Sequence, residues 1–213
     1  MTGRIPIAIT ALVAAAALAT PASAGETDTI EVGDDFYAPD KYNGSLGTDV
    51  HWLPDGGAGD QHNVRASGKL FKSGPLTDDI DFTISPSSGT FAYYCLEHGT
   101  KSGLGMAGTL KIPPRQAATK RGGDVIGVAW SDSSTDIADQ YDVRYKGPGT
   151  NGQYKTWLKN TDEEEGTFGE VDDPTDVKPG RNYSFQVRSE DSSEPSKRRS
   201  DWSPTLKVTA GTR

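Results

Sequence analysis

The chain has 213 residues, a formal net charge of −8 and 33% hydrophobic residues, with one cysteine, three histidines and two methionines. The acidic balance argues against a nucleic-acid partner, because neutralising phosphates requires clustered Lys and Arg. A single cysteine excludes an intramolecular disulfide and any cysteine-rich zinc or iron–sulfur site. The length fits one or two modest domains.

The N-terminus has the three parts of a secretory signal peptide. Arg4 gives a positive start, residues 5–19 form an apolar run, and the small residues 22–24 follow Pro21. The run is shorter than the roughly 20 apolar residues that a membrane-spanning helix needs. We expect cleavage after Ala24 and an exported protein that is secreted, periplasmic or held at the cell surface. Loss of Arg4 changes the net charge from −8 to −9.

Short alternating or β-branched runs follow, separated by clusters of Gly, Pro, Asp, Asn and Ser, and they show almost no helical period. They predict strands at 29–32, 49–53, 81–84, 90–94 and 108–112, and a second set at 125–130, 141–145, 154–158, 183–188 and 205–209.

Two consecutive prolines at 113–114 separate the two sets, because proline cannot continue a sheet ladder. We therefore predict an all-β fold made of two tandem β-sandwiches. The first covers 25–114, a linker covers 115–120, and the second covers 121–213. Each half is long enough to enclose a core of its own. We expect the charged loop at 160–176 to be mobile.

A thiol, an imidazole and a thioether follow one another closely. Cys95 comes after a predicted strand, His98 lies three residues later, and Met106 follows a Gly-rich turn. His62 supplies a second imidazole from an upstream loop. Two His and one Cys with a weak axial Met form the electron-transfer copper site. Zinc also binds two His and a Cys, but the thioether suits copper better. His51 lies outside this pattern and is expected to be an ordinary strand residue.

Each of these residues also has an ordinary interpretation. Cys95 would be a small buried core residue, the histidines would be surface polar groups, and Met106 would fill a gap. The order of all four in one context favours the metal site.

These residues, together with the segment 36–39 and the triplet 62–64, stand in an order that resembles the cupredoxins of the plastocyanin and azurin family. The resemblance covers residues 28–112. It implies an eight-stranded Greek-key sandwich with one type 1 copper ion near one end. The ligands it implies are His62, Cys95, His98 and Met106. The interval from His98 to Met106 is three residues longer than the plastocyanin pattern Cys-x₂-His-x₄-Met.

The same resemblance implies roles for the neighbours of the ligands. Asn63 would lie behind the ligands and lock their loops together. Tyr94 matches a tyrosine on a second electron-transfer route through the cysteine, with an ordinary strand aromatic as the alternative. The edge of His98 would be exposed within an apolar patch.

The second half resembles a fibronectin type III domain over about residues 118–211. The resemblance rests on Trp130, the segment 141–145, and Pro-Gly followed by the Tyr-x-Phe-x-Val pattern that starts at Tyr183, which is typical of a tyrosine corner. Such a fold does not set a function; it can serve as a spacer, an adhesion unit or a docking surface. The basic run 197–199 would contact an acidic surface or remain solvated.

We expect a non-enzymatic one-electron carrier with one copper ion, Cu(I) or Cu(II), and an appended docking or spacer module. The alternatives are an extracytoplasmic copper carrier or buffer, and a cell-surface adhesion protein with an incidental metal site. Enzymes with further copper ions need several more histidines, and only His51 remains outside the predicted ligand set. The expected partners are redox proteins and a cell-surface or extracellular partner for 121–213, with no nucleic acid and no membrane span.

Overall fold

The computed structural model describes residues 27–57, 59–117, 124–170, 173 and 176–211. Within these residues the chain forms strands and turns without any helix, which confirms the all-β prediction. The described part accordingly offers no helix with the length and apolarity to cross a membrane. The predicted signal peptide and residues 118–120 of the predicted linker lie outside the described residues.

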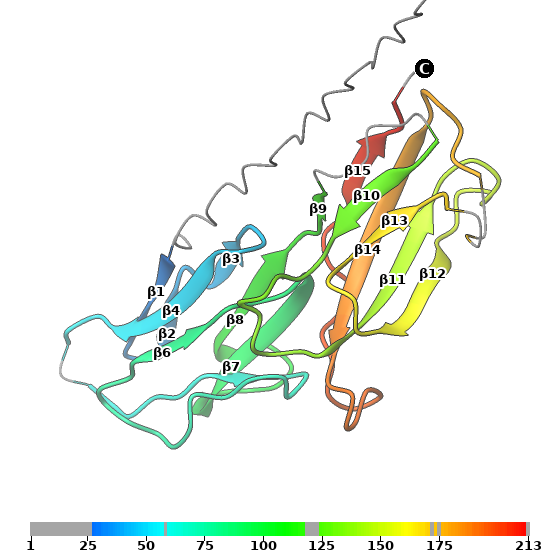
Figure 1. Cartoon of the computed structure of the whole chain (residues 1–213). Coiled ribbons are helices and arrows are strands. Elements are labelled where there is room, and N and C mark those ends of the chain that lie inside the picture. The colour runs from blue at the N-terminus through cyan, green and yellow to red at the C-terminus, as the bar shows by residue number, and fades with distance from the viewer. Residues whose placement is uncertain (1–26, 58, 118–123, 171–172, 174–175, 212–213) are drawn as a thin grey trace, which may run out of the picture.

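The first half contains eight described strands in two four-stranded sheets (Figure 1). One sheet has the order β2-β1-β4-β6, and its strands are Phe36–Ala38, Thr27–Gly33, Asp49–Pro54 and Phe82–Ile84. The other has the order β3-β8-β7-β5, and its strands are Lys41–Asn43, Gly105–Ile112, Gly89–Gly99 and Arg65–Ala66. The sequence predicted five of the eight; the other three, β2, β3 and β5, are each three residues long or shorter.

The two sheets enclose one apolar core because their strands alternate inward and outward side chains. On β7, Phe91, Tyr93 and Cys95 are buried and the residues between them are only half-buried. Trp52 of β4 meets Tyr93 of β7 edge to face, with ring centroids 5.4 Å apart. This contact joins the two sheets, and Cys95 lies on the same inward face two residues further along β7.

The second half contains a three-stranded and a four-stranded sheet. The first has the order β13-β10-β9, and its strands are Glu165–Phe168, Ile126–Ala129 and Arg115–Gln116. The second has the order β12-β11-β14-β15, and its strands are Lys155–Thr161, Gln140–Lys146, Asn182–Glu190 and Leu206–Thr209. The first two residues of the predicted linker therefore form a strand, and the exact domain boundaries stay a prediction.

The expectation of a mobile loop at 160–176 is wrong for its central part. Residues 165–168 form β13, which pairs antiparallel with β10. Phe168 is fully buried, with its ring 5.1 Å from that of Trp157 and 5.3 Å from that of Phe185. This strand was not predicted because acidic residues precede Phe168, and one aromatic residue among charged ones gives no alternating hydrophobic pattern.

The tyrosine expected at the corner before β14 takes the position that its pattern indicates. Tyr183 is buried, and its hydroxyl accepts a hydrogen bond of 2.9 Å from the backbone N–H of Lys178, five residues upstream. This bond is typical of a tyrosine corner.

Buried hydroxyls join the two halves. The hydroxyls of Ser87 and Ser189 lie 2.7 Å apart, and the Ser189 hydroxyl donates to the Ser88 carbonyl at 2.7 Å. A backbone bridge follows between Thr90 on β7 and Asp201, with N···O distances of 3.1 and 2.9 Å. Satisfied polar groups that are buried in this way hold a defined relative position.

One apolar side chain of the second half completes the core of the first. Ile137 is 7% exposed and packs in the same cluster as Trp52 and Phe71. The first core is therefore not closed by residues 27–112 alone.

Replacing Ile137 with Ala should lower the free energy of unfolding by about 2–4 kcal/mol, because it removes buried methyl and methylene groups and leaves a cavity. Urea unfolding measures the change. Leu104→Ala is the control: this leucine is 69% exposed, so its loss should change stability by less than about 0.5 kcal/mol. Equal stabilities of the two variants would contradict the assignment of Ile137 to the first core.

Candidate metal centre

A bulge in the pairing of β7 with β8 shapes the centre. Tyr94 pairs with Ala107, but the next pair along is Gly99 with Gly105. The four residues 95–98 of β7 therefore stand opposite Met106 alone on β8. A bulge of this kind redirects side chains that a regular ladder would send to alternate faces. It places the thiol, the imidazole and the thioether predicted from the sequence within one short piece of hairpin.

Glycines at both edges make this bulge sterically feasible. A Cβ on Gly99 would lie 2.1 Å from the carbonyl oxygen of Met106, and one on Gly105 would lie 2.3 Å from that of His98. Gly105 also has a positive φ of 71°, which side chains disfavour. The strands can approach here only because both side chains are missing.

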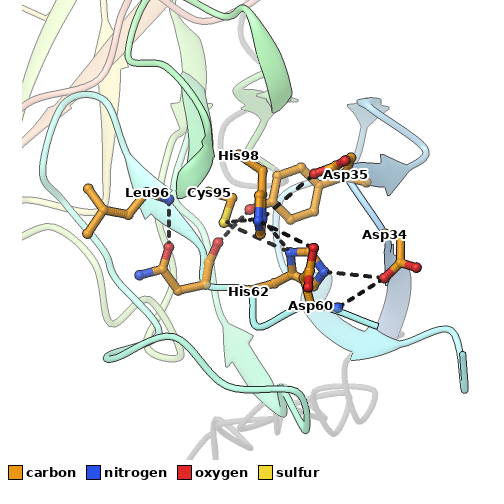
Figure 2. A network of polar contacts seen from close by, with 9 residues as sticks. Asp34, Asp35, Asp60, His62, Cys95, Leu96 and His98 are labelled. Carbon is orange, nitrogen blue, oxygen red and sulfur yellow. Dashed lines mark hydrogen bonds and ion pairs between the residues drawn. The ribbon is translucent and has the colours of Figure 1, made fainter. Parts of the chain in front are cut away.

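Three of the four predicted ligands meet at one point (Figure 2). The Sγ atom of Cys95 lies 3.6 Å from Nδ1 of His98 and 4.0 Å from Nδ1 of His62, and the two nitrogens are 3.1 Å apart. A triangle with these sides has a circumradius of about 2.1 Å, which matches ordinary metal–nitrogen and metal–sulfur lengths of about 2.0–2.3 Å. A single cation can therefore accept lone pairs from all three atoms.

These three ligand groups are largely shielded from water, which favours their binding a metal ion. Cys95 is 0% and His62 5% exposed, whereas the side chain of His98 is 16% exposed. The Nε2 atom of His62 is buried and has no hydrogen-bond partner among the described residues; the nearest carboxylate oxygen, on Asp34, is 3.9 Å away. At that distance the contact is electrostatic and not a hydrogen bond.

Of the other residues singled out in the sequence, Met106 and Tyr94 belong to the hairpin that carries the cluster, and His51 lies outside it. Met106 is buried on β8 opposite the bulge, and its ligation stays a prediction. Tyr94 is half-buried and pairs with Arg65 and Ala107, and its electron-transfer role also stays a prediction. His51 lies outside the cluster on β4, where its Nε2 is 2.6 Å from Asp81 Oδ1.

Asn63 ties together the two loops that carry the ligands. Its Oδ1 accepts a hydrogen bond of 2.9 Å from the backbone N–H of Leu96, between Cys95 and His98. Its Nδ2 donates to the carbonyl of Gly74 at 3.2 Å. Since Asn63 is 2% exposed and adjacent to His62, these bonds fix the His62 loop against the bulge.

A buried tyrosine holds the same residue from the other side. The hydroxyl of Tyr37 donates a hydrogen bond of 2.5 Å to the carbonyl of Asn63. Burial, followed by the nearby charges of Cys95 and Tyr93, raises the pKa of Tyr37 well above its usual value. The hydroxyl therefore remains a donor throughout the neutral and moderately alkaline range.

Three exposed carboxylates, which were not predicted from the sequence, surround the histidines. Asp35 Oδ1 is 3.8 Å from Nδ1 of His98, Asp60 Oδ2 is 3.9 Å from its Nε2, and Asp34 faces His62 (Figure 2). The Asp-Asp pair directly before the segment 36–39, and an Asp two residues before His62, were the available signals. These carboxylates make the local potential favourable for a cation.

The apolar patch expected around His98 is therefore mixed with acidic groups. Three large apolar side chains are exposed in the described part of the chain, namely Phe36, Leu96 and Leu104. Leu96 lies between two predicted ligands, Leu104 lies two residues before Met106, and Phe36 follows the Asp34–Asp35 pair. Each lies close in sequence to a residue of the centre.

Comparisons with known proteins name two kinds of structure. No protein-family model matches the sequence, and no curated protein matches it either. A mutant plastocyanin of fern is 27% identical, over 40% of this chain and 99% of its own, with a TM-score of 0.31. The fibronectin type III domain of human fibronectin type III domain containing protein 3 is 18% identical, over 47% of this chain and 86% of its own, with a TM-score of 0.34. The two neighbours are of the two kinds that the sequence resembles.

Asn63→Ala should lower copper affinity by about 10–100-fold, because the His62 loop and the bulge lose their link. It should also lower the free energy of unfolding of the metal-free chain by about 1–3 kcal/mol, since the Leu96 N–H is left without its acceptor. Competition titration with a copper chelator and urea unfolding measure the two effects. Gln61→Ala, at an exposed position beside His62, is the matched control. Loss of affinity in the control alone would contradict this role.

Comparing Gly105→Ala with Gly103→Ala separates two losses of stability: the steric conflict of a side chain at the bulge, and the strain of a positive φ. Both residues have positive φ, but no atom lies within 4 Å of a Cβ on Gly103. Gly103→Ala should therefore cost about 1 kcal/mol of stability. Gly105→Ala should cost at least about 1 kcal/mol more, because the His98 carbonyl must move. Thermal unfolding of both variants measures the difference, and equal losses would show that the bulge tolerates a side chain.

Proposed function

We propose that this chain is an exported, non-enzymatic copper protein that carries one electron at a time. The observation that carries the proposal is the convergence of two imidazole nitrogens and one buried thiol sulfur on a point about 2.1 Å from each. His62, Cys95 and His98 would hold the ion, with Met106 as the weak fourth ligand across the bulge.

The donor set favours copper over the alternatives. Two imidazoles and a thiolate with a distant thioether form the arrangement of blue-copper electron-transfer sites, whereas structural zinc prefers four strong tetrahedral ligands. Bound there, copper would supply a Cu(I)/Cu(II) couple. The chain holds the ligands in place through Asn63, Tyr37 and the glycines of the bulge, so that little needs to rearrange when the charge changes.

Burial separates the sulfur ligands from water and leaves one ligand near the surface. Cys95 and Met106 are 0% and 1% exposed, while the His98 ring lies partly at the surface. We infer that electrons enter and leave at this ring. The exposed Leu96 and Leu104 supply apolar contact there, and the neighbouring carboxylates favour a redox partner with a positive face.

The second half would act as a docking or spacer module. It adds no titratable ligand to the metal cluster, which consists of His62, Cys95 and His98 in the described part of the chain. Its firm attachment through Ser189 and Asp201 supports a role in positioning the centre, and its outer surface is where a cell-surface or extracellular partner would bind.

The full chain loaded with copper should show the intense visible band of a thiolate-to-copper transition and a reversible one-electron couple. Cys95→Ser should lose the band, and Met106→Leu should keep it but change the reduction potential, because the axial ligand tunes the couple. His51→Gln is the matched control and should leave both unchanged. Optical spectra, EPR and voltammetry provide the measurements.

Three outcomes would contradict the electron-carrier proposal. A band that survives in Cys95→Ser would remove the thiolate from the site. Rapid transfer of the metal itself to an acceptor protein, without a reversible couple, would identify a copper carrier or buffer instead. Absence of the couple in the wild-type protein, together with normal attachment of the Cys95→Ser variant to its target, would favour an adhesion protein.

A further inference from the structure

A groove of about 550 Å³ lies where the two halves meet, away from the predicted ligands. Its volume falls within the roughly 300–1,000 Å³ of small-molecule sites. The apolar side chains that line it are buried, except for the half-buried Phe82, and therefore form its floor: Leu70, Phe71, Phe82, Ile84 and Ile137. The rings of Phe71 and Phe82 lie 6.4 Å apart and are tilted by only 36°, so together they offer an aromatic surface.

Cationic side chains that are exposed or half-buried form the rim of this groove: Arg65, Lys69, Lys72 and Arg198. One carboxylate, that of Asp136, stands among them. The concentration of positive charge is unusual because the chain has 30 acidic and only 22 basic residues. It is therefore not explained by the average composition of the surface.

Most of these cations form no close ion pair, although Lys69 adds to the effect of Lys197 in lowering the pKa of the Glu194 carboxyl. In the described part of the chain, no carboxylate oxygen lies within 4.0 Å of the side-chain nitrogens of Arg65, Lys69 or Lys72. Only Arg198 is paired, through a contact of 2.8 Å with Asp191. Three cations without a close ion pair, around an apolar floor, suit a ligand that brings an anionic group and an apolar body together.

Both halves of the chain build the groove, and the contacts between them hold it in shape. Asp136, Ile137 and Arg198 come from the second half, and the other lining residues come from the first. The backbone N–H of Ser85 donates to Asp136 Oδ1 at 3.2 Å, and the Asp136 N–H donates to the Ser85 carbonyl at 3.4 Å. The floor is thus formed before any ligand arrives, which reduces the entropic cost of binding.

We propose that this interdomain groove binds a small organic anion with an aromatic or aliphatic body, such as an aryl carboxylate. The apolar body would lie on Phe71 and Phe82, and the carboxylate would face Lys69, Lys72 and Arg65. None of the lining residues is a predicted ligand or one of the three carboxylates near the histidines, so the proposal stands independently of copper. It gives the junction a binding role in addition to its structural one.

Calorimetric titration of the full chain with 1-naphthoate tests the groove. Saturable binding at one site is expected, at least about tenfold tighter than that of 1-naphthalenemethanol, which lacks the charge, and of acetate, which lacks the apolar body. Lys69→Gln and Lys72→Gln should each weaken naphthoate binding roughly fivefold, as expected for a partly exposed charge contact. Lys155→Gln, at an exposed position on β12, is the matched control and should bind as the wild type does.

A blocking variant keeps the test independent of charge. Thr83 lines the groove at an exposed position of β6, where a bulky strand-forming residue can be accommodated, so Thr83→Trp should abolish binding without unfolding the chain. Circular dichroism checks the fold. Equal binding of the neutral alcohol, unchanged affinity in both lysine variants, or unchanged affinity in a folded Thr83→Trp protein would each overturn the proposal. A hexaglutamate peptide that binds more tightly than naphthoate would also overturn it, in favour of a protein partner.

Discussion

The candidate metal centre depends on one irregularity, the bulge that sets four residues of β7 against Met106 of β8. In a regular ladder, Cys95 and His98 would point to opposite faces of the sheet, because side chains three positions apart alternate. The bulge removes that constraint and brings sulfur and imidazole to one side. Gly99 and Gly105 permit the close approach, and Asn63 then attaches the loop that carries His62. Burial, ligand geometry and exposure of one imidazole edge all follow from this arrangement.

The rest of the first half serves to keep this hairpin rigid. The Trp52–Tyr93 contact joins the sheets two residues before Cys95, so that the strand leading to the thiol is anchored in the core. Tyr37 reaches from the opposite sheet to the carbonyl of Asn63. Rigidity of this kind suits a centre whose charge changes while its ligands stay in place. The mixed acidic and apolar surface around His98 belongs to the same end of the hairpin, and the groove at the junction involves other residues altogether.

Local patterns made much of the fold and part of the centre predictable. The long strands show clear alternation, and Cys95, His98 and Met106 lie on one hairpin whose spacing is visible in the sequence. Features that depend on contacts distant in the chain could not be predicted in the same way. The positions of Asp34 and Asp60 beside the histidines depend on how separate turns pack against the hairpin, and the burial of Ile137 depends on an interface between two domains. The strand ending at Phe168 was missed because its neighbours are charged.

The shared core has a consequence for how such a chain can change over evolutionary time. The second half completes the core of the first half with Ile137, and its Ser189 hydrogen-bonds buried serines of the first half. It is therefore not an independently exchangeable domain. Exchanging the second half for another sandwich of the same fold would leave a cavity beside Trp52 and Phe71. It would also remove the partner of the Ser87 hydroxyl and of the Ser88 carbonyl. Recombination at the boundary is therefore penalised, and the two halves should be inherited, duplicated and lost together.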